Sequence, residues 1–129
     1  MPVPDPAPSV TRTLRVFDPE VFGHLALHRP ALQIELIELF LQQGRETRAR
    51  LPALAAEGCE PFRNAIHALV GSARIVAAVQ LCAVIERAHE PGRLDSRESR
   101  EQAGQEVAEA FDAVAPVLDA FAGELRRAG

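Results

Sequence analysis

Apolar side chains recur along most of the chain at intervals of three or four positions, a pattern typical of helices with one buried face. The pattern predicts five helices, over about residues 19–27, 30–57, 61–77, 78–89 and 96–127. No stretch alternates apolar and polar residues beside a hairpin signal, so no strand is predicted. Four long amphipathic helices joined by short loops predict an all-α protein, an antiparallel four-helix bundle with a short additional N-terminal helix.

Prolines and capping residues set the predicted helix ends. Asp18 precedes a proline and suits the first N-cap. Pro61 is expected in the first turn of the third helix. Asp95 and Glu98 have the spacing of a capping box at the start of the last helix. Pro116 is expected to kink that helix without ending it, because the apolar stripe keeps its phase across the proline.

His67 lies beside the apolar stripe of the third predicted helix. At about 100° per residue, its imidazole lies about 100° from Ile66, at the centre of the stripe. Arg63 and Arg74, at about 60° and 80°, share that side of the helix, and Gly71 lies near 140°. Small residues thus surround an imidazole flanked by two guanidinium groups, and a large partner can approach the ring. The predicted stripe itself comprises Phe62, Ile66, Leu69, Val70, Ala73 and Ala77.

The same residues resemble the phosphoacceptor motif of histidine-containing phosphotransfer (HPt) domains, H-x-L-K-G-S-[SA]-x-x-L-G-A-x-x-L. The likeness runs from His67 to Ala73 and continues in Val76-Ala77-Ala78 and Leu81. Upstream, residues 17–21 (FDPEV) and 36–41 (LIELFL) are similar to the family's opening and to its long second helix. The resemblance covers roughly residues 14–125.

Two positions depart from the family pattern. Val70 stands where the family usually has lysine, and Ala77 where it has the second glycine. A lysine at position 70 would meet the phosphoryl group, whereas valine supplies no charge. Arg74, one turn further along, is one candidate for the missing positive charge, and poor transfer or binding without transfer is the other reading.

The resemblance implies a phosphorelay intermediate that accepts a phosphoryl group on His67 from a receiver-domain aspartate, or from a kinase, and passes it to a response regulator. Such a protein is a phosphocarrier and not an enzyme in the usual sense, because it is itself modified in each cycle. The implied partners are receiver domains and a hybrid histidine kinase. No bound cofactor is expected, since the Mg²⁺ ion belongs to the receiver, and HPt modules are commonly monomers.

Two further residues receive roles beside His67. Ser72 lies at about 240° on the helical wheel, away from the imidazole, so its hydroxyl is expected to bond back to a carbonyl group. His89 falls near the end of the next helix, where some HPt domains have a polar residue that hydrogen-bonds the phosphorylatable ring. A solvated histidine favoured by a helix C-terminus is the alternative for His89.

Two other functions stay open at this point. One is an HPt-like binding module that docks and regulates a receiver or a histidine kinase without transferring phosphate, which the departures at Val70 and Ala77 favour. The other is a structural helical bundle in which His67 has no chemical role.

Composition and charge limit the domain organisation, the partners and the location that can be expected. The 129 residues are enough for one domain, with residues 1–13 as a disordered proline-rich tail and 14–129 as the bundle. The formal charge of −4 leaves no basic stripe for nucleic acid. Cys59 and Cys82 are too few for a disulfide framework, and Cys82 suits a core position. No apolar leader or membrane-spanning run is evident, so a cytoplasmic location is expected.

One histidine pair lies outside this site. His24 and His28 are four residues apart, the spacing of a metal-binding pair on one helical face. No third ligand is evident nearby and His28 falls at a helix end, so no metal site is predicted from the sequence.

Overall fold

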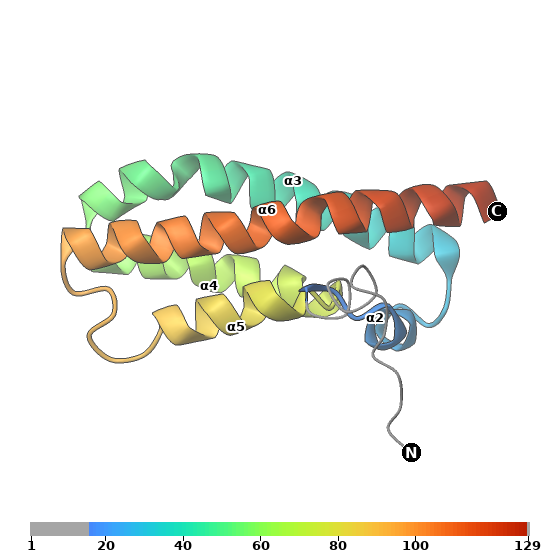
Figure 1. Ribbon diagram of the computed structural model, residues 1–129, viewed down its shortest axis with the longest axis horizontal. Helices are drawn as coiled ribbons and strands as arrows, with labels where there is room; N and C mark the ends of the chain where they lie inside the picture. Colours follow the sequence, from blue (N-terminus) through green and yellow to red (C-terminus); the bar gives the residue numbers. More distant parts are fainter. Residues whose placement is uncertain (1–15, 129) are drawn as a thin grey trace, which may run out of the picture.

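The computed structural model describes residues 16–128, and all regular structure in that range is helical. The predicted tail, residues 1–13, lies outside this range. The helices are α2 (Pro19–Leu25), α3 (Pro30–Glu57), α4 (Cys59–Ile75), α5 (Val79–Ala88) and α6 (Arg97–Ala128) (Figure 1). The prediction of an all-helical chain is confirmed. Each predicted helix is present, although α2 ends two residues earlier and α4 begins two residues earlier than expected.

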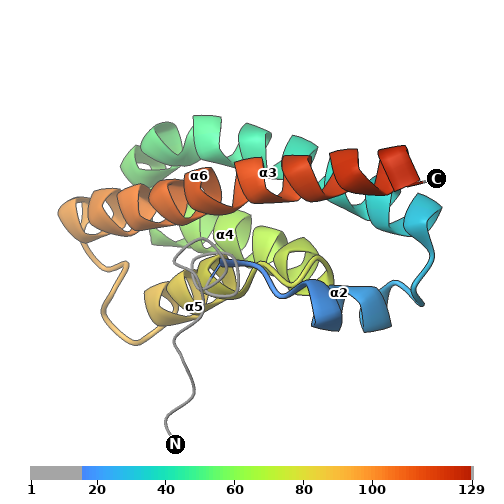
Figure 2. The same cartoon turned by 45° about the vertical axis from the view of Figure 1, so that its right-hand side comes forward.

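The helices pack in a cycle of neighbours. α3 lies along α6 and α4, and α5 packs against α4 and α6. Consecutive helices from α3 to α6 run in opposite directions (Figures 1 and 2). α2 lies at the end of the molecule where α4 passes into α5, and there the amide of Asp18 donates a hydrogen bond of 3.1 Å to the carbonyl of Ala77. α2 is thereby tied to the connection that follows the His67 helix.

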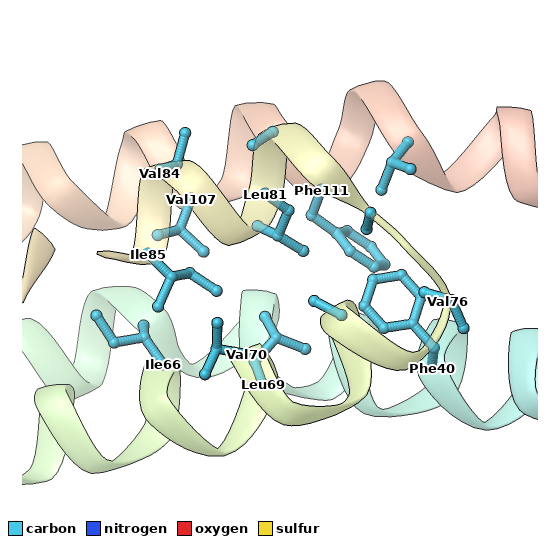
Figure 3. Close-up of a cluster of buried hydrophobic side chains, with 14 of the residues drawn as sticks. Phe40, Ile66, Leu69, Val70, Val76, Leu81, Val84, Ile85, Val107 and Phe111 are labelled. Carbon is cyan, nitrogen blue, oxygen red and sulfur yellow. The ribbon is translucent and has the colours of Figure 1, made fainter. Parts of the chain in front are cut away.

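The apolar stripe predicted for α4 forms one side of a common core. All six of its members are buried, and Ile66 and Ala73 have no exposed surface. Figure 3 shows the α4 side chains beside those of α5 and α6, among them Leu81, Ile85 and Val107. Burying an aliphatic side chain stabilises a fold by about 1.5–3 kcal/mol, so this packing fixes which side of α4 faces solvent.

Ion pairs across the α3–α6 contact agree with the antiparallel direction. Arg48 donates two hydrogen bonds to Asp112, of 2.7 and 2.6 Å, and Arg45 lies 3.6 Å from Asp119. The arginine nearer the start of α3 thus meets the aspartate nearer the end of α6. All four side chains are substantially exposed, so these pairs contribute about 0–1 kcal/mol each and are less important than the core.

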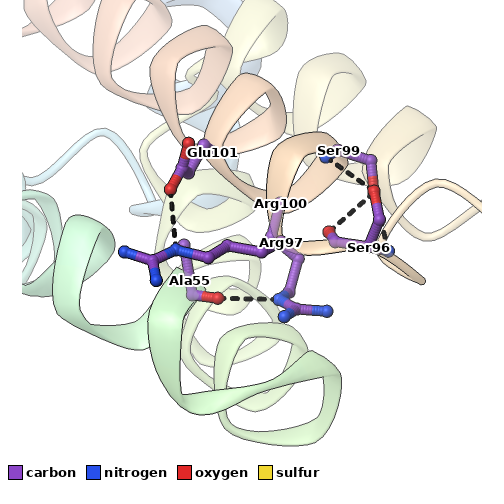
Figure 4. A network of polar contacts seen from close by, with 6 residues as sticks. All are labelled: Ala55, Ser96, Arg97, Ser99, Arg100 and Glu101. Atoms are coloured by element: carbon purple, nitrogen blue, oxygen red, sulfur yellow. Dashed lines mark hydrogen bonds and ion pairs between the residues drawn. The ribbon is translucent and has the colours of Figure 1, made fainter.

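The cap at the start of α6 differs from the prediction. The capping box forms one residue later than expected, between Ser96 and Ser99, and the pairing of Asp95 with Glu98 is wrong. The amide of Ser99 donates to Ser96 Oγ at 3.0 Å, and the amide of Ser96 donates to Ser99 Oγ at 3.1 Å (Figure 4). Because Arg97 is the first helical residue, Ser96 occupies the N-cap and its hydroxyl reaches the third amide of the helix.

Arg100, which sequence reasoning does not single out, is buried at the junction of α3, α6 and the loop that precedes α6. Its Nε donates to the Ala55 carbonyl at 2.8 Å (Figure 4). Its Nη1 donates to the Leu94 carbonyl at 3.0 Å. Ala55 lies in the last turn of α3, where carbonyl groups lack partners within the helix. The guanidinium group of Arg100, a residue of α6, therefore caps the C-terminal end of α3.

Two prolines lie inside helices, Pro52 in α3 and Pro116 in α6, and both helices continue past them. The expectation that Pro116 does not end the last helix is confirmed. Among residues 16–128, no helix combines the length and the apolar composition that crossing a bilayer requires.

Candidate functional site

His67 lies in the middle of α4 with its side chain exposed, as predicted. The next turn of the helix leaves the surface free, because a Cβ added to Gly71 would meet no heavy atom within 4 Å. Ala68, beside the histidine, is also exposed and small. The described part of the chain therefore leaves the approach to this imidazole uncrowded.

The structure brings His89 against His67. The two ring centroids lie 5.6 Å apart, with their planes at 67°. His89 caps the C-terminal end of α5, the position named in the alternative interpretation, and its side chain is half-buried rather than fully solvated. No hydrogen bond joins the two rings among the described residues, so the expected bond from His89 to His67 is not formed in this conformation.

A hydrogen bond from Nδ1 of His89 explains the orientation of its ring. Nδ1 lies 2.8 Å from the Ile85 carbonyl oxygen, one turn earlier in α5. A carbonyl oxygen can only accept, so Nδ1 donates and carries the proton. Nε2 is buried and has no hydrogen-bond partner within residues 16–128. In the neutral ring this atom is an acceptor without a donor, next to His67.

The two arginines on the His67 side of α4 differ in their contacts. Arg74 Nη2 lies 3.1 Å from Glu86 Oε1 on α5, and both side chains are about 60% exposed (61% and 59%). Such an exposed pair is worth about 0–1 kcal/mol, so a doubly charged ligand can compete for the arginine. Arg63 is exposed one turn before His67, and it makes no hydrogen bond or ion pair with any residue in the described range. Arg63 is the better candidate for a free positive charge.

Val70 lies in the core with 4% of its surface exposed (Figure 3). It packs on the α5 side of α4 and supplies neither charge nor a hydrogen bond to the surface beside His67. The position that carries lysine in the motif is thus structural in this chain.

Ser72 has the structural role expected of it. Its hydroxyl lies 3.1 Å from the Leu69 carbonyl and 2.7 Å from Oε1 of Gln43 on α3. Gln43 also donates to the Ala68 carbonyl at 3.3 Å. Gln43 was missed in the sequence, where it is one of two adjacent glutamines and only helix packing selects it. Together these bonds fix α4 against α3 one turn from His67.

Ala77 lies in the turn that ends α4. Ala77 has a left-handed backbone with φ of 54°. Its amide donates to the Arg74 carbonyl at 3.0 Å and the amide of Ala78 donates to the Ala73 carbonyl at 2.9 Å, the paired bonds of a Schellman cap. Glycine adopts this conformation without strain, whereas alanine is disfavoured by about 1–2 kcal/mol.

Several exposed apolar side chains lie on the same end of the molecule. Ile75 and Val79, each 45% exposed, flank the turn from α4 to α5. Leu39, 57% exposed, lies one turn before Gln43 on α3, and the contacts of Gln43 place it near the last turns of α4. Contiguous exposed apolar surface is a feature of protein contact sites.

Comparison with models of protein families, with curated proteins and with solved structures finds no match to the chain.

Proposed function

We propose that this chain is a phosphorelay intermediate that carries a phosphoryl group on His67, receiving it from a receiver-domain aspartate or a kinase and passing it to a response regulator. The observation that carries the proposal is the exposed imidazole halfway along α4 with free space above Gly71. The motif around His67 and the exposed guanidinium of Arg63 support the same chemistry. The proposal places the protein in the cytoplasm as a monomer whose partners are receiver domains and a hybrid histidine kinase.

The proposed function includes a finer description of the fold. We interpret α3 to α6 as an antiparallel four-helix bundle, with α2 as the additional N-terminal helix, in one HPt-like domain over residues 14–129. The cyclic packing of the four helices and the alternation of their directions support this interpretation. In such a bundle α4 exposes the flank that carries His67.

The transfer step needs little from the protein beyond an available nitrogen. A lone pair of the neutral imidazole attacks the phosphorus of the aspartyl phosphate, the bond from phosphorus to the aspartate oxygen breaks, and the carboxylate leaves. The imidazole then loses the proton from its other nitrogen. Positioning and charge stabilisation dominate such transfers. Arg63, and Arg74 once released from Glu86, would neutralise the phosphoryl oxygens.

A second function, from another class, is a binding module that docks a receiver or a histidine kinase and regulates it without accepting phosphate. The buried Val70 favours it, because the motif position that usually supplies a cation supplies none here. The ion pair of Arg74 with Glu86 favours it as well, since that arginine is already engaged.

One assay distinguishes these functions. The protein is mixed with a receiver domain labelled on its aspartate, in the presence of Mg²⁺, and examined for label that is lost in acid and retained in alkali. We expect such label on the wild type and on His24→Gln, a matched variant at another exposed histidine, and none on His67→Gln. Binding of the receiver without label would support the regulatory module. A lack of both binding and label would leave only a structural bundle.

A further inference from the structure

His24 and His28 bring two imidazole nitrogens together at the surface, away from His67. His24 lies in the last turn of α2, and His28 follows the helix cap. The ring centroids are 4.8 Å apart with planes at 75°, and Nε2 of His28 lies 3.3 Å from Nδ1 of His24. Both side chains are exposed. The two nitrogens therefore face each other where a small ion can reach them.

The backbone holds the pair in this arrangement. Leu27 and His28 both have left-handed backbone, with φ of 56° and 52°. The amide of His28 donates to the Gly23 carbonyl at 2.7 Å, which turns the chain back over the end of α2. A Cβ on Gly23 would lie 3.1 Å from His28 Nδ1, so the glycine makes room for the ring. The backbone turn that ends α2 thus positions His28 beside His24.

Backbone hydrogen bonds hold this ending: the amide of Leu27 donates to the His24 carbonyl at 3.2 Å, beside the bond from His28 to Gly23. A left-handed conformation is unfavourable for a residue with a side chain, and two consecutive residues, Leu27 and His28, adopt it. Strained backbone of this kind persists where the surrounding structure fixes it, and it gathers at functional sites.

We propose that His24 and His28 form a binding site for zinc or a similar borderline divalent metal ion. At zinc–nitrogen distances of about 2.0–2.1 Å and a tetrahedral angle, two ligand nitrogens lie about 3.3 Å apart. The observed separation of 3.3 Å agrees with that value. A square-planar ion such as copper(II) brings its neighbouring nitrogens closer, to about 2.9 Å, so the geometry favours zinc. When the ion binds, the ring that donates in the hydrogen bond moves its proton to its opposite nitrogen, so both facing nitrogens offer a lone pair and each neutral imidazole still carries one proton.

The site supplies two ligands from this chain. Within residues 16–128, no group of three or more histidine, cysteine, aspartate or glutamate side chains is placed to hold an ion. Water or a group from another molecule completes the coordination, so reversible binding is expected, and the fold does not depend on the metal. The inference is independent of the role proposed for His67.

Titration of the full chain, without a polyhistidine tag, tests the site. Zinc chloride is followed by calorimetry, and cobalt(II) serves as the spectroscopic probe, because its visible absorption strengthens in tetrahedral coordination. We expect one ion per chain, with affinity reduced more than about tenfold by His24→Gln and by His28→Gln, since even the outer partners of a metal ligand are worth that much. His67→Gln should bind zinc like the wild type.

Two results would overturn the assignment. One is the absence of any zinc binding by the wild type. The other is binding that persists in the double variant of His24 and His28 but disappears in His67→Gln or Cys59→Ser, which would place the ion elsewhere. Both histidines are exposed, so the variants should fold, and circular dichroism confirms this before titration.

Discussion

At the scale of single residues, the bond from His89 Nδ1 to the Ile85 carbonyl decides where that ring keeps its proton. The neutral ring must be the Nδ1–H form, which leaves Nε2 as an acceptor beside His67. We expect ¹⁵N-edited NMR of the neutral His89 ring to show a protonated Nδ1 and an unprotonated Nε2. His24→Gln and His28→Gln remove overlapping signals without touching this ring. A ring protonated on Nε2 would contradict the orientation of His89.

Cys82 provides a pH-dependent prediction at the same scale. Burial raises the pKa of its thiol, the nearby Arg74 opposes this effect, and Glu86 adds to it. The folded state thus favours the neutral thiol. The stability this contributes is fully present below the pKa of the unfolded chain, and it is lost as pH rises through the higher folded value.

The alkylation rate measures this shift directly. In a Cys59→Ser variant, the rate of reaction with iodoacetamide should rise with pH along a curve displaced to higher pH than that of the chain unfolded in guanidinium. Arg74→Gln removes a cation that favours the thiolate, so it should displace the curve further. A folded curve that coincides with the unfolded one would show that the thiol is not sheltered.

At the scale of helices, two glycines in helix interiors have opposite surroundings. A Cβ on Gly44 in α3 would lie 2.1 Å from Cε2 of Phe111, whereas a Cβ on Gly71 in α4 would meet nothing. Alanine is favoured over glycine in a helix by about 0.8–1.0 kcal/mol. Gly71→Ala should therefore raise the free energy of unfolding by up to about 1 kcal/mol. Gly44→Ala should lower it by about 1–2 kcal/mol, because overpacking outweighs the gain in helix propensity.

Urea denaturation of the two variants and the wild type checks this pair. The midpoints should move in opposite directions with an unchanged slope, which reports stability alone. If Gly44→Ala were as stabilising as Gly71→Ala, the close approach of α3 to the Phe111 ring would be wrong.

The helices were predictable from the sequence because periodicity and helix breakers act locally. The stripe around Ile66 fixes the buried side of α4, and Asp18 caps α2 through bonds of 3.1 Å to the amides of Glu20 and Val21. What escaped prediction depends on contacts between helices. The burial of Arg100 under the end of α3 requires the loop before α6 to be in place, and nothing in its neighbours marks it.

In the candidate site, too, the features set by a single helix were predictable and those set by contacts between helices were not. The exposure of His67 and the burial of Val70 follow from their angles on one helix, and both are confirmed. The approach of His89 to His67 depends on how α5 turns back after Ala77, and its carbonyl bond has no sequence signature. The pairing of Arg74 with Glu86 depends on the same turn.

At the scale of the whole molecule, packing separates the face that carries His67 from the elements that hold it in place. α4 is held by the core on one side and by Ser72 and Gln43 on another, so its exposed side is rigidly presented. The ring needs no motion of its own chain to become accessible. A partner that encloses it must instead cover Gly71, and this requirement can be tested without altering the histidine.

Gly71→Leu should abolish phosphoryl transfer to His67 while the fold remains stable. The added side chain extends into free space, so it should not disturb the core, and leucine favours the helix. It would occupy the surface that a docked receiver must cover, so both receiver binding and acid-labile label should fall at least about tenfold, the effect of losing about 1.4 kcal/mol of binding free energy. Ala113→Leu is the matched control, since it adds leucine at an exposed position of α6, which packs mainly against α3 and α5. Transfer that continues unchanged in Gly71→Leu would mean that partners do not close over this side of α4, and the phosphocarrier proposal would lose its geometric basis.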